Sequence, residues 1–121
     1  MSPVLAAPQR HVVRVDGREV PTDSEGYLLR LDDWSEAFAQ ALARDEGLTL
    51  TPEHWAVIRF LREYYQEHGV QAQVRVMVRH FSALWGAERG SNHALHEMFP
   101  VGGPQKQGNR LAGLMRTKGE H

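Results

Sequence analysis

Charged and amide side chains between residues 104 and 118 form the group in this sequence whose types and spacing best suit binding chemistry. Lys106, Gln107 and Arg110 stand at helical spacing, and Arg116 and Lys118 continue the positive charge towards the C-terminus. Cations arranged in this way can pair with carboxylates on a protein or with phosphates on a nucleic acid. We therefore predict a basic partner-binding segment here. The alternative is a solvated charged face without a partner.

Patterns typical of catalysis are missing from the rest of the chain. None of the 121 residues is a cysteine, which excludes disulfides, thiolate nucleophiles, persulfides and cysteine-bound metal on these residues. The acidic pairs Asp32-Asp33 and Asp45-Glu46 stand where helix ends are expected, not at the spacing of two converging carboxylates. No serine has the glycines of a nucleophile elbow around it. We expect no catalytic residue, no enzyme activity and no cofactor.

The seven histidines raise the question of a metal site. His93 and His96 are three residues apart, with Glu97 beside them, so a helix could turn all three to one side. A zinc site usually needs a third and a fourth ligand at compatible spacing, and no matching motif occurs elsewhere. We expect no metal site.

A second binding hypothesis concerns DNA. Two predicted helices meet near residues 69–72, and Arg75, Arg79 and His80 would lie on the outer side of the second, as in a helix-turn-helix. The connection is slightly long for that motif, and the formal net charge of the chain is only −1. A solvated helix face explains the same arginines.

The elements that must position these residues follow from hydrophobic periodicity and from capping residues. Asp16-Gly17 favours a tight hairpin turn between two valine-rich segments within residues 12–20. Asp32 or Asp33 is expected to cap a first helix, and Thr51-Pro52-Glu53 begins a second. Further helices are predicted near residues 74–85, 92–99 and 104–114. The prediction is a mainly α fold: a small orthogonal bundle of about five helices with an N-terminal β-hairpin and a C-terminal arm.

Composition agrees with a single globular domain. Apolar residues make up 41% of the chain and charged residues 24%, and no stretch approaches eighteen consecutive apolar residues. We expect a flexible leader at residues 1–9, a domain at 10–114 and an arm at 115–121. We also expect a cytoplasmic protein that does not bind a membrane.

Six runs of the sequence match a pattern found in one protein family. They are Asp-Trp-Ser-Glu at 33–36, Leu-Thr-Pro-Glu-His-Trp at 50–55, Ile-Arg-Phe-Leu-Arg-Glu-Tyr-Tyr at 58–65, Leu-His-Glu-Met-Phe-Pro at 95–100, Gly-Pro-Gln-Lys-Gln at 103–107 and Ala-Gly-Leu at 112–114. In these runs the sequence resembles the DsrC/TusE family, which includes gamma-subunit-like proteins of dissimilatory sulfite reductase and sulfur-relay proteins of tRNA thiolation. The resemblance covers about residues 10–119. It implies the DsrC-like helical fold with an N-terminal hairpin and a C-terminal arm.

The sequence departs from the family at the residues that carry its chemistry. The resemblance implies a sulfur-carrying cysteine at the penultimate position and, in some members, a second about ten residues earlier. Here these positions hold Glu120 and Asn109, and two prolines of the family's arm correspond to Met115 and Thr117. Neither a carboxylate nor an amide can form a persulfide.

Three hypotheses follow from the sequence. The first is a non-catalytic regulatory or adaptor protein of sulfur metabolism, bound to a protein partner such as a sulfite-reductase-like or sulfur-relay complex. The second is a DNA-binding transcriptional regulator. The third is a sulfur-transfer component of tRNA thiolation or sulfite reduction, as the family resemblance implies.

Overall fold

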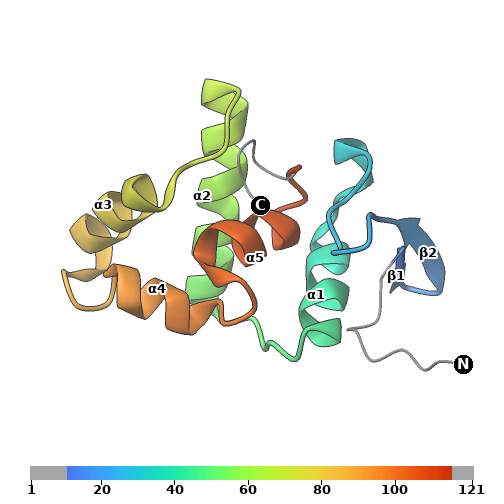
Figure 1. The fold of residues 1–121 in the computed structure, drawn as a ribbon, viewed down its shortest axis with the longest axis horizontal. Coiled ribbons are helices and arrows are strands. Elements are labelled where there is room, and N and C mark those ends of the chain that lie inside the picture. Colours follow the sequence, from blue (N-terminus) through green and yellow to red (C-terminus); the bar gives the residue numbers. More distant parts are fainter. Residues whose placement is uncertain (1–10, 116–121) are drawn as a thin grey trace, which may run out of the picture.

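A computed structural model describes residues 11–115 of the chain. The predicted leader, most of the predicted arm, and the candidate residues Arg116, Lys118 and Glu120 lie outside the described residues. The elements, in order, are β1 (Val12–Val15), β2 (Arg18–Pro21), a 3₁₀ helix η1 (Leu31–Asp33), α1 (Glu36–Asp45), α2 (Pro52–His68), α3 (Val74–Trp85), α4 (Asn92–Met98) and α5 (Gly103–Leu111). Five helices and an antiparallel hairpin confirm the predicted fold class (Figure 1).

The hairpin forms where the sequence predicts it. Asp16 and Gly17 have φ values of 51° and 82°, which is the backbone that a two-residue type I′ turn requires. Val13 pairs with Val20 across the strands, and both side chains are buried, as is that of Val15. Because side chains alternate along a strand, this register places the three valines on one face, which packs against the rest of the core.

The first helix begins later than expected. Asp32 and Asp33 belong to η1, and the residue that caps α1 is Ser35, whose hydroxyl oxygen accepts a hydrogen bond from the backbone N–H of Phe38 at 3.0 Å. Trp34 has an extended backbone (φ −74°, ψ 142°), which separates the two helices. The prediction of an aspartate cap is therefore wrong, because the capping side chain must lie three residues before the N–H that it satisfies.

The second helix begins as the sequence predicts, at Thr51, with a histidine completing the cap. Nδ1 of His54 accepts a hydrogen bond from the Thr51 backbone N–H at 3.1 Å. Its Nε2 then carries the hydrogen and donates to the backbone oxygen of Met98 at 2.7 Å. The cap of α2 thus also ties α2 to the end of α4.

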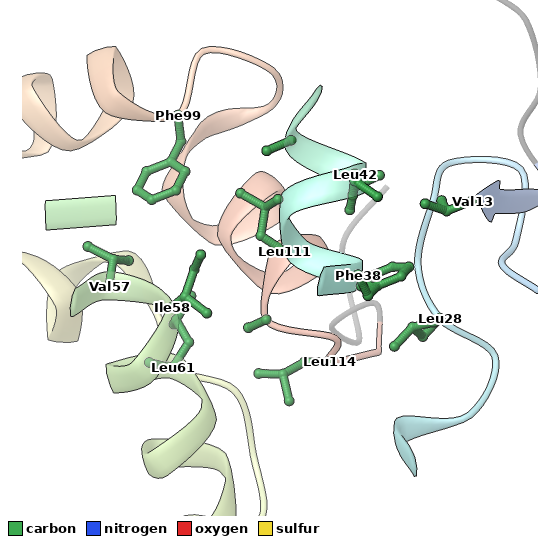
Figure 2. Packing of buried hydrophobic residues seen from close by; sticks show 14 of the residues in the cluster. Val13, Leu28, Phe38, Leu42, Val57, Ile58, Leu61, Phe99, Leu111 and Leu114 are labelled. Carbon is green, nitrogen blue, oxygen red and sulfur yellow. The ribbon is translucent and has the colours of Figure 1, made fainter. Parts of the chain in front are cut away.

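Helix α5 lies at the centre of the molecule, among α1, α2 and α4 (Figure 1). Leu111 and Leu114 meet Phe38 and Leu42 of α1 on one side and residues of α2 on the other (Figure 2). A Cβ at Gly108 would lie 2.8 Å from the Leu61 side chain, so a glycine there lets α5 approach α2 closely. Within residues 11–115, no helix is long and apolar enough to cross a membrane.

Candidate functional site around the C-terminal helix

Helix α5 is polar in sequence but buried in the structure. It starts at Gly102 and Gly103, whose positive φ values of 102° and 90° let the chain turn sharply into the helix. Gln107, Asn109 and Arg110 have exposed fractions of 0%, 0% and 5%. Polar groups buried to this degree need partners within the protein. Those partners define the candidate site.

Glu46, the residue at which α1 ends, is the partner of Arg110. The guanidinium donates through Nε to Oε2 of Glu46 at 3.1 Å and through Nη2 to Oε1 at 3.0 Å. The side chains of Glu46 and Arg110 are 1% and 6% exposed. A two-bond fork of this kind fixes both the distance and the orientation of the two groups. It therefore locks the end of α1 to α5.

Gln107 completes the network around this ion pair. Its Nε2 donates to Oε1 of Glu46 at 2.8 Å, and its Oε1 accepts from the backbone N–H of Val101 at 3.0 Å. Arg110 also donates through Nη2 to the Val101 backbone oxygen at 2.7 Å. The turn before α5 is thus held by the same two side chains that hold Glu46. The Arg110 Cζ lies 5.7 Å from the ring centroid of Tyr27.

The electrostatics of Arg110 are decided by Glu46. Burial by itself lowers the pKa of Arg110, but the hydrogen bond and the negative charge of Glu46, with a smaller contribution from Tyr27, outweigh it. The pKa is therefore raised above its ordinary value. Stability from this raised pKa is fully present below the unfolded value and is lost only in strong alkali, so the pair stays charged at neutral pH.

These contacts change the interpretation of the basic segment. Gln107 and Arg110 were predicted to contact a partner, but their side chains are buried and bind Glu46 instead. Helical spacing places these two side chains on the face that packs against α1, and a partner-binding role for them remains a prediction. Lys106 is half-buried, and Arg116 and Lys118 lie outside the described residues. A partner-binding role for these three remains a prediction.

Asn109 is the unusual residue of α5. Its side chain is 0% exposed, and neither Oδ1 nor Nδ2 has a hydrogen-bond partner among the residues that the structure describes. A buried amide without partners costs about 1–3 kcal/mol per unsatisfied group. The family resemblance places a cysteine here, which behaves as a small apolar side chain when buried. Asn109 therefore occupies a position shaped for a less polar residue.

The segment after α5 is held by two side chains from other helices and loops. Trp34 donates through its indole Nε1 to the backbone oxygen of Leu111, and Arg62 donates through Nη1 to that of Ala112, both at 2.8 Å. The Arg62 Cζ lies 3.8 Å from the Trp34 ring centroid, in cation–π contact. Burial lowers the pKa of Arg62. These bonds satisfy carbonyl groups that a helix end leaves unpaired.

The chain turns at Gly113, next to Trp34, and Gln71 binds the backbone two residues later. Gly113 has a φ of 74°, and a Cβ built on it would lie 2.3 Å from Cδ1 of Trp34. Gln71, from the α2–α3 connection, donates to the backbone oxygen of Met115 at 2.9 Å. The direction in which the chain leaves the domain is therefore set by contacts up to Met115. We call Trp34, Arg62, Gln71 and Gly113 the arm base.

The three residues predicted to contact DNA, Arg75, Arg79 and His80, are all exposed on α3. His80 stacks on Phe60 of α2, with ring centroids 4.3 Å apart, and Arg79 lines a groove between α2 and α3. The Arg75 side chain is exposed and donates through Nε to Oε1 of Gln73 at 3.1 Å. The structure thus gives His80 a packing role on the groove wall.

The histidines proposed for a metal site bind other groups. Nε2 of His93 lies 3.2 Å from a carboxylate oxygen of Glu97, and Nδ1 of His96 lies 2.8 Å from the backbone oxygen of Asn92. Among residues 11–115, no three histidine or acidic side chains are grouped so that they could hold a metal ion.

Sequence reasoning missed Glu46, Trp34 and Arg62. Glu46 carried one signal: a carboxylate at the C-terminal end of a helix is unfavourable next to the helix dipole, so a cation from elsewhere was to be expected. The indole N–H of Trp34 binds a carbonyl on a segment 77 residues away, which the local sequence does not indicate. Such long-range partners are not visible in local periodicity.

The chain is similar to known proteins over most of its length. The family described as DsrC-like protein matches residues 14–119. A sulfurtransferase TusE from Salmonella choleraesuis is 46% identical over 99 residues, which are 82% of this chain and 90% of that protein. A sulfurtransferase TusE from Yersinia pestis is 43% identical over 103 residues, with 85% and 94% covered.

Two solved structures have a fold similar to that of this chain. The oxidised gamma-subunit of dissimilatory sulfite reductase (DsrC) from Archaeoglobus fulgidus has a TM-score of 0.81 and 33% identity, covering 91% of this chain and 99% of that one. The NMR structure of Allochromatium vinosum DsrC has a TM-score of 0.78 and 41% identity, covering 91% and 97%.

These relatives correct one expectation from the sequence. The prediction that the chain is not an enzyme rested on its missing cysteines, yet relatives 43–46% identical to it are named sulfurtransferases. The names of these relatives indicate a sulfurtransferase and overturn that prediction. The family match, the relatives and the shared fold give one conclusion: this chain belongs to the DsrC-like protein family.

Proposed function

We propose that this chain is a component of a sulfur relay and acts by binding a protein partner. The observation that carries the proposal is the similarity to proteins named sulfurtransferase TusE over 82% of the chain and 90% of the relative. The arm base supports it, because three side chains and the turn at Gly113 fix the course of the chain as far as Met115. A fixed exit suits a segment that must reach a defined site on another protein.

The chemistry of such a relay is set by the absence of cysteine. A thiolate on an acceptor protein attacks the outer sulfur of a persulfide on a donor protein. The S–S bond of the donor breaks, the donor's cysteine leaves as a thiolate, and the acceptor now carries the persulfide. No oxidant is needed. Since none of the 121 residues is a cysteine, both sulfur-bearing groups belong to partners in this proposal, and this chain brings or holds them together. A cytoplasmic location is part of the proposal.

A complementation experiment tests this function. A Salmonella strain that lacks its TusE would express either this chain or its Glu120→Cys variant, and thiolated RNA would be measured by its retardation in a mercury-containing gel. We expect the unmodified chain to restore thiolated RNA, because partners supply the thiols. The Glu120→Cys variant shows whether a thiol at the family's position improves transfer. It also controls for expression and docking.

Two other results have different meanings. If only Glu120→Cys restores thiolation, and the unmodified chain lowers it in the parent strain, the chain occupies the partner's site and the regulatory hypothesis replaces the proposal. If neither protein restores thiolation and neither lowers it, binding to a relay partner is refuted. DNA binding, the other hypothesis from the sequence, gains no support from the relatives.

A further inference from the structure

Residues of α2 and α3 line a shallow groove. Of these two helices, α3 lies at the end of the molecule away from the hairpin (Figure 1). The groove has a volume of about 560 Å³, which is within the range of protein binding sites. It is separate from α5 and from the arm base. We call it the α2–α3 groove, and its main lining residues are Phe60, Tyr64 and His68 from α2 and Val76, Arg79 and Leu84 from α3.

Stacked rings form one wall of the groove. Phe60 stacks on His80 at a centroid distance of 4.3 Å, and Tyr64 lies 4.2 Å from His68. Phe60 also meets Phe81 of the core edge-on at 5.3 Å. Because the ring wall is anchored in the core, its shape exists before any ligand arrives. Such a wall loses little conformational entropy on binding.

The floor of the groove exposes apolar surface. Leu84 is 61% exposed although it belongs to a helix that has a well-formed buried face. Val76 lies two turns before it along α3 and faces the same groove. Apolar surface that is concave and accessible is typical of sites that receive an apolar side chain of a partner.

Two arginines place positive charge on the α3 side of the groove. Arg79 lines the groove, and Arg75 precedes it by one helical turn on α3. Glu67 is the one acidic residue among the described residues that line the groove, and a carboxylate oxygen of it lies 3.3 Å from Nε2 of His68. Such a rim is complementary to carboxylates.

We propose that the α2–α3 groove binds an amphipathic acidic segment of a partner protein, which inserts apolar side chains against Phe60 and Leu84 and places carboxylates at Arg75 and Arg79. A helix with apolar residues three and four positions apart fits a groove between two helices. This proposal deepens the proposed function, on which it rests only for the identity of the partner. The binding itself can be measured without any sulfur transfer.

The probe is a fluorescein-labelled synthetic helix of fourteen residues, designed with leucine at every third and fourth position and glutamate elsewhere. Its affinity for the full chain would be measured by fluorescence anisotropy at low salt. We expect Arg79→Glu to weaken binding about tenfold, which is the order expected for reversing a charge that meets carboxylates. Leu84→Ala should weaken binding about fivefold, because it removes apolar contact area.

Matched controls separate the groove from general charge. Arg18→Glu makes the same charge change on the hairpin, at the opposite end of the molecule, and should leave affinity within about twofold (Figure 1). A probe with lysine in place of glutamate should bind at least about tenfold more weakly than the acidic probe. Leu84 and Arg79 are exposed, so neither substitution removes a core contact, and unchanged melting curves would verify this.

Three results would overturn the proposal. These are equal binding of the acidic and basic probes, equal loss in Arg18→Glu and Arg79→Glu, and displacement of the probe by a random-sequence DNA duplex at lower concentration than by unlabelled peptide. The last would assign the face to nucleic acid. Failure of the complementation experiment leaves this outcome untouched, and failure of peptide binding leaves the relay hypothesis standing, so the two are distinguished.

Discussion

Glu46 is a carboxylate at the C-terminal end of a helix, where the helix dipole disfavours negative charge. Arg110 and Gln107 offset this cost, because they supply three hydrogen bonds to its two oxygens. The ion pair joins residues 64 positions apart in sequence, so it links the front of the chain to α5. At the scale of single residues, this pair is a buried ion pair that joins two distant helices.

Removing the charge of Glu46 should therefore be costly. Glu46→Gln keeps the shape of the side chain but leaves the buried Arg110 guanidinium without a counter-charge, and we expect a loss of about 3–5 kcal/mol in the free energy of unfolding. Urea denaturation measures it. Asp45→Asn makes the same chemical change at the neighbouring exposed residue and should cost less than about 0.5 kcal/mol. Equal losses in the two variants would contradict the role given to the buried pair.

Asn109 presents the opposite case, a polar side chain whose removal should help. Asn109→Cys nearly conserves volume and replaces two unpaired polar atoms by a thiol that tolerates burial. We expect the free energy of unfolding to rise by about 1–2 kcal/mol, read from the midpoint of a urea transition. A decrease would mean that the amide has a partner that this conformation lacks. The new thiol should react slowly with a thiol-specific reagent in the folded protein, since the position is buried.

At the scale of elements, glycines decide where the chain turns. Gly47 and Gly113 both follow helices and have nearly equal φ values of 73° and 74°. They differ in their surroundings: a Cβ at Gly47 meets nothing within 4 Å, whereas one at Gly113 would overlap Trp34. The pair therefore separates the backbone cost of an L-residue from the packing cost of the arm base.

We expect Gly47→Ala to destabilise the protein by about 1 kcal/mol, from backbone strain alone. Gly113→Ala should cost about 2–4 kcal/mol, because the indole must also move. Movement of Trp34 would break its bond to the Leu111 oxygen and its stacking on Arg62, so tryptophan emission should shift to longer wavelength in this variant only. Identical melting temperatures for the two variants would show that Trp34 does not constrain the turn.

The scale of elements is also where the sequence was most informative. Thr51 and Gly69 bound α2, and Asp16-Gly17 marked the hairpin, because caps and turns depend on residues within a few positions of one another. The cap of α1 was misplaced by a few residues, because three capping-type side chains, Asp32, Asp33 and Ser35, lie close together. Only backbone geometry shows which of them reaches an N–H.

At the scale of the whole molecule, the packing of helices creates side-chain contacts that could not be predicted from the sequence. Arg110 looked like a surface cation because its local spacing is compatible with exposure, and its partner Glu46 is brought to it by the packing of α1 on α5. His80 was predicted to contact DNA from its place on α3 alone. Its ring also stacks on Phe60 of α2, a contact that spacing along α3 does not predict. The family and its fold were recognisable because motifs along most of the chain carry them. The contacts of the candidate site could not be predicted, because they join residues that are far apart in the sequence.

The C-terminal boundary of the folded domain can be tested by shortening the chain. Leu114 is 3% exposed and belongs to the core, whereas Met115 is 46% exposed. A chain that ends after Met115 keeps every described contact of the arm base, so its melting temperature should stay within about 2 °C of the full chain, as expected for a change below about 0.5 kcal/mol. This outcome would support the predicted boundary between the domain and the arm.

A chain that ends after Leu111 is the matched comparison. It loses the Ala112 oxygen that binds Arg62, the turn at Gly113 and the buried Leu114 side chain. Loss of one buried leucine alone costs about 2–5 kcal/mol, so the melting temperature should fall by more than about 10 °C for a domain of this size. If instead both truncations lower it equally, residues 116–121 belong to the folded unit. The relay proposal would then need a docking surface other than a separate arm.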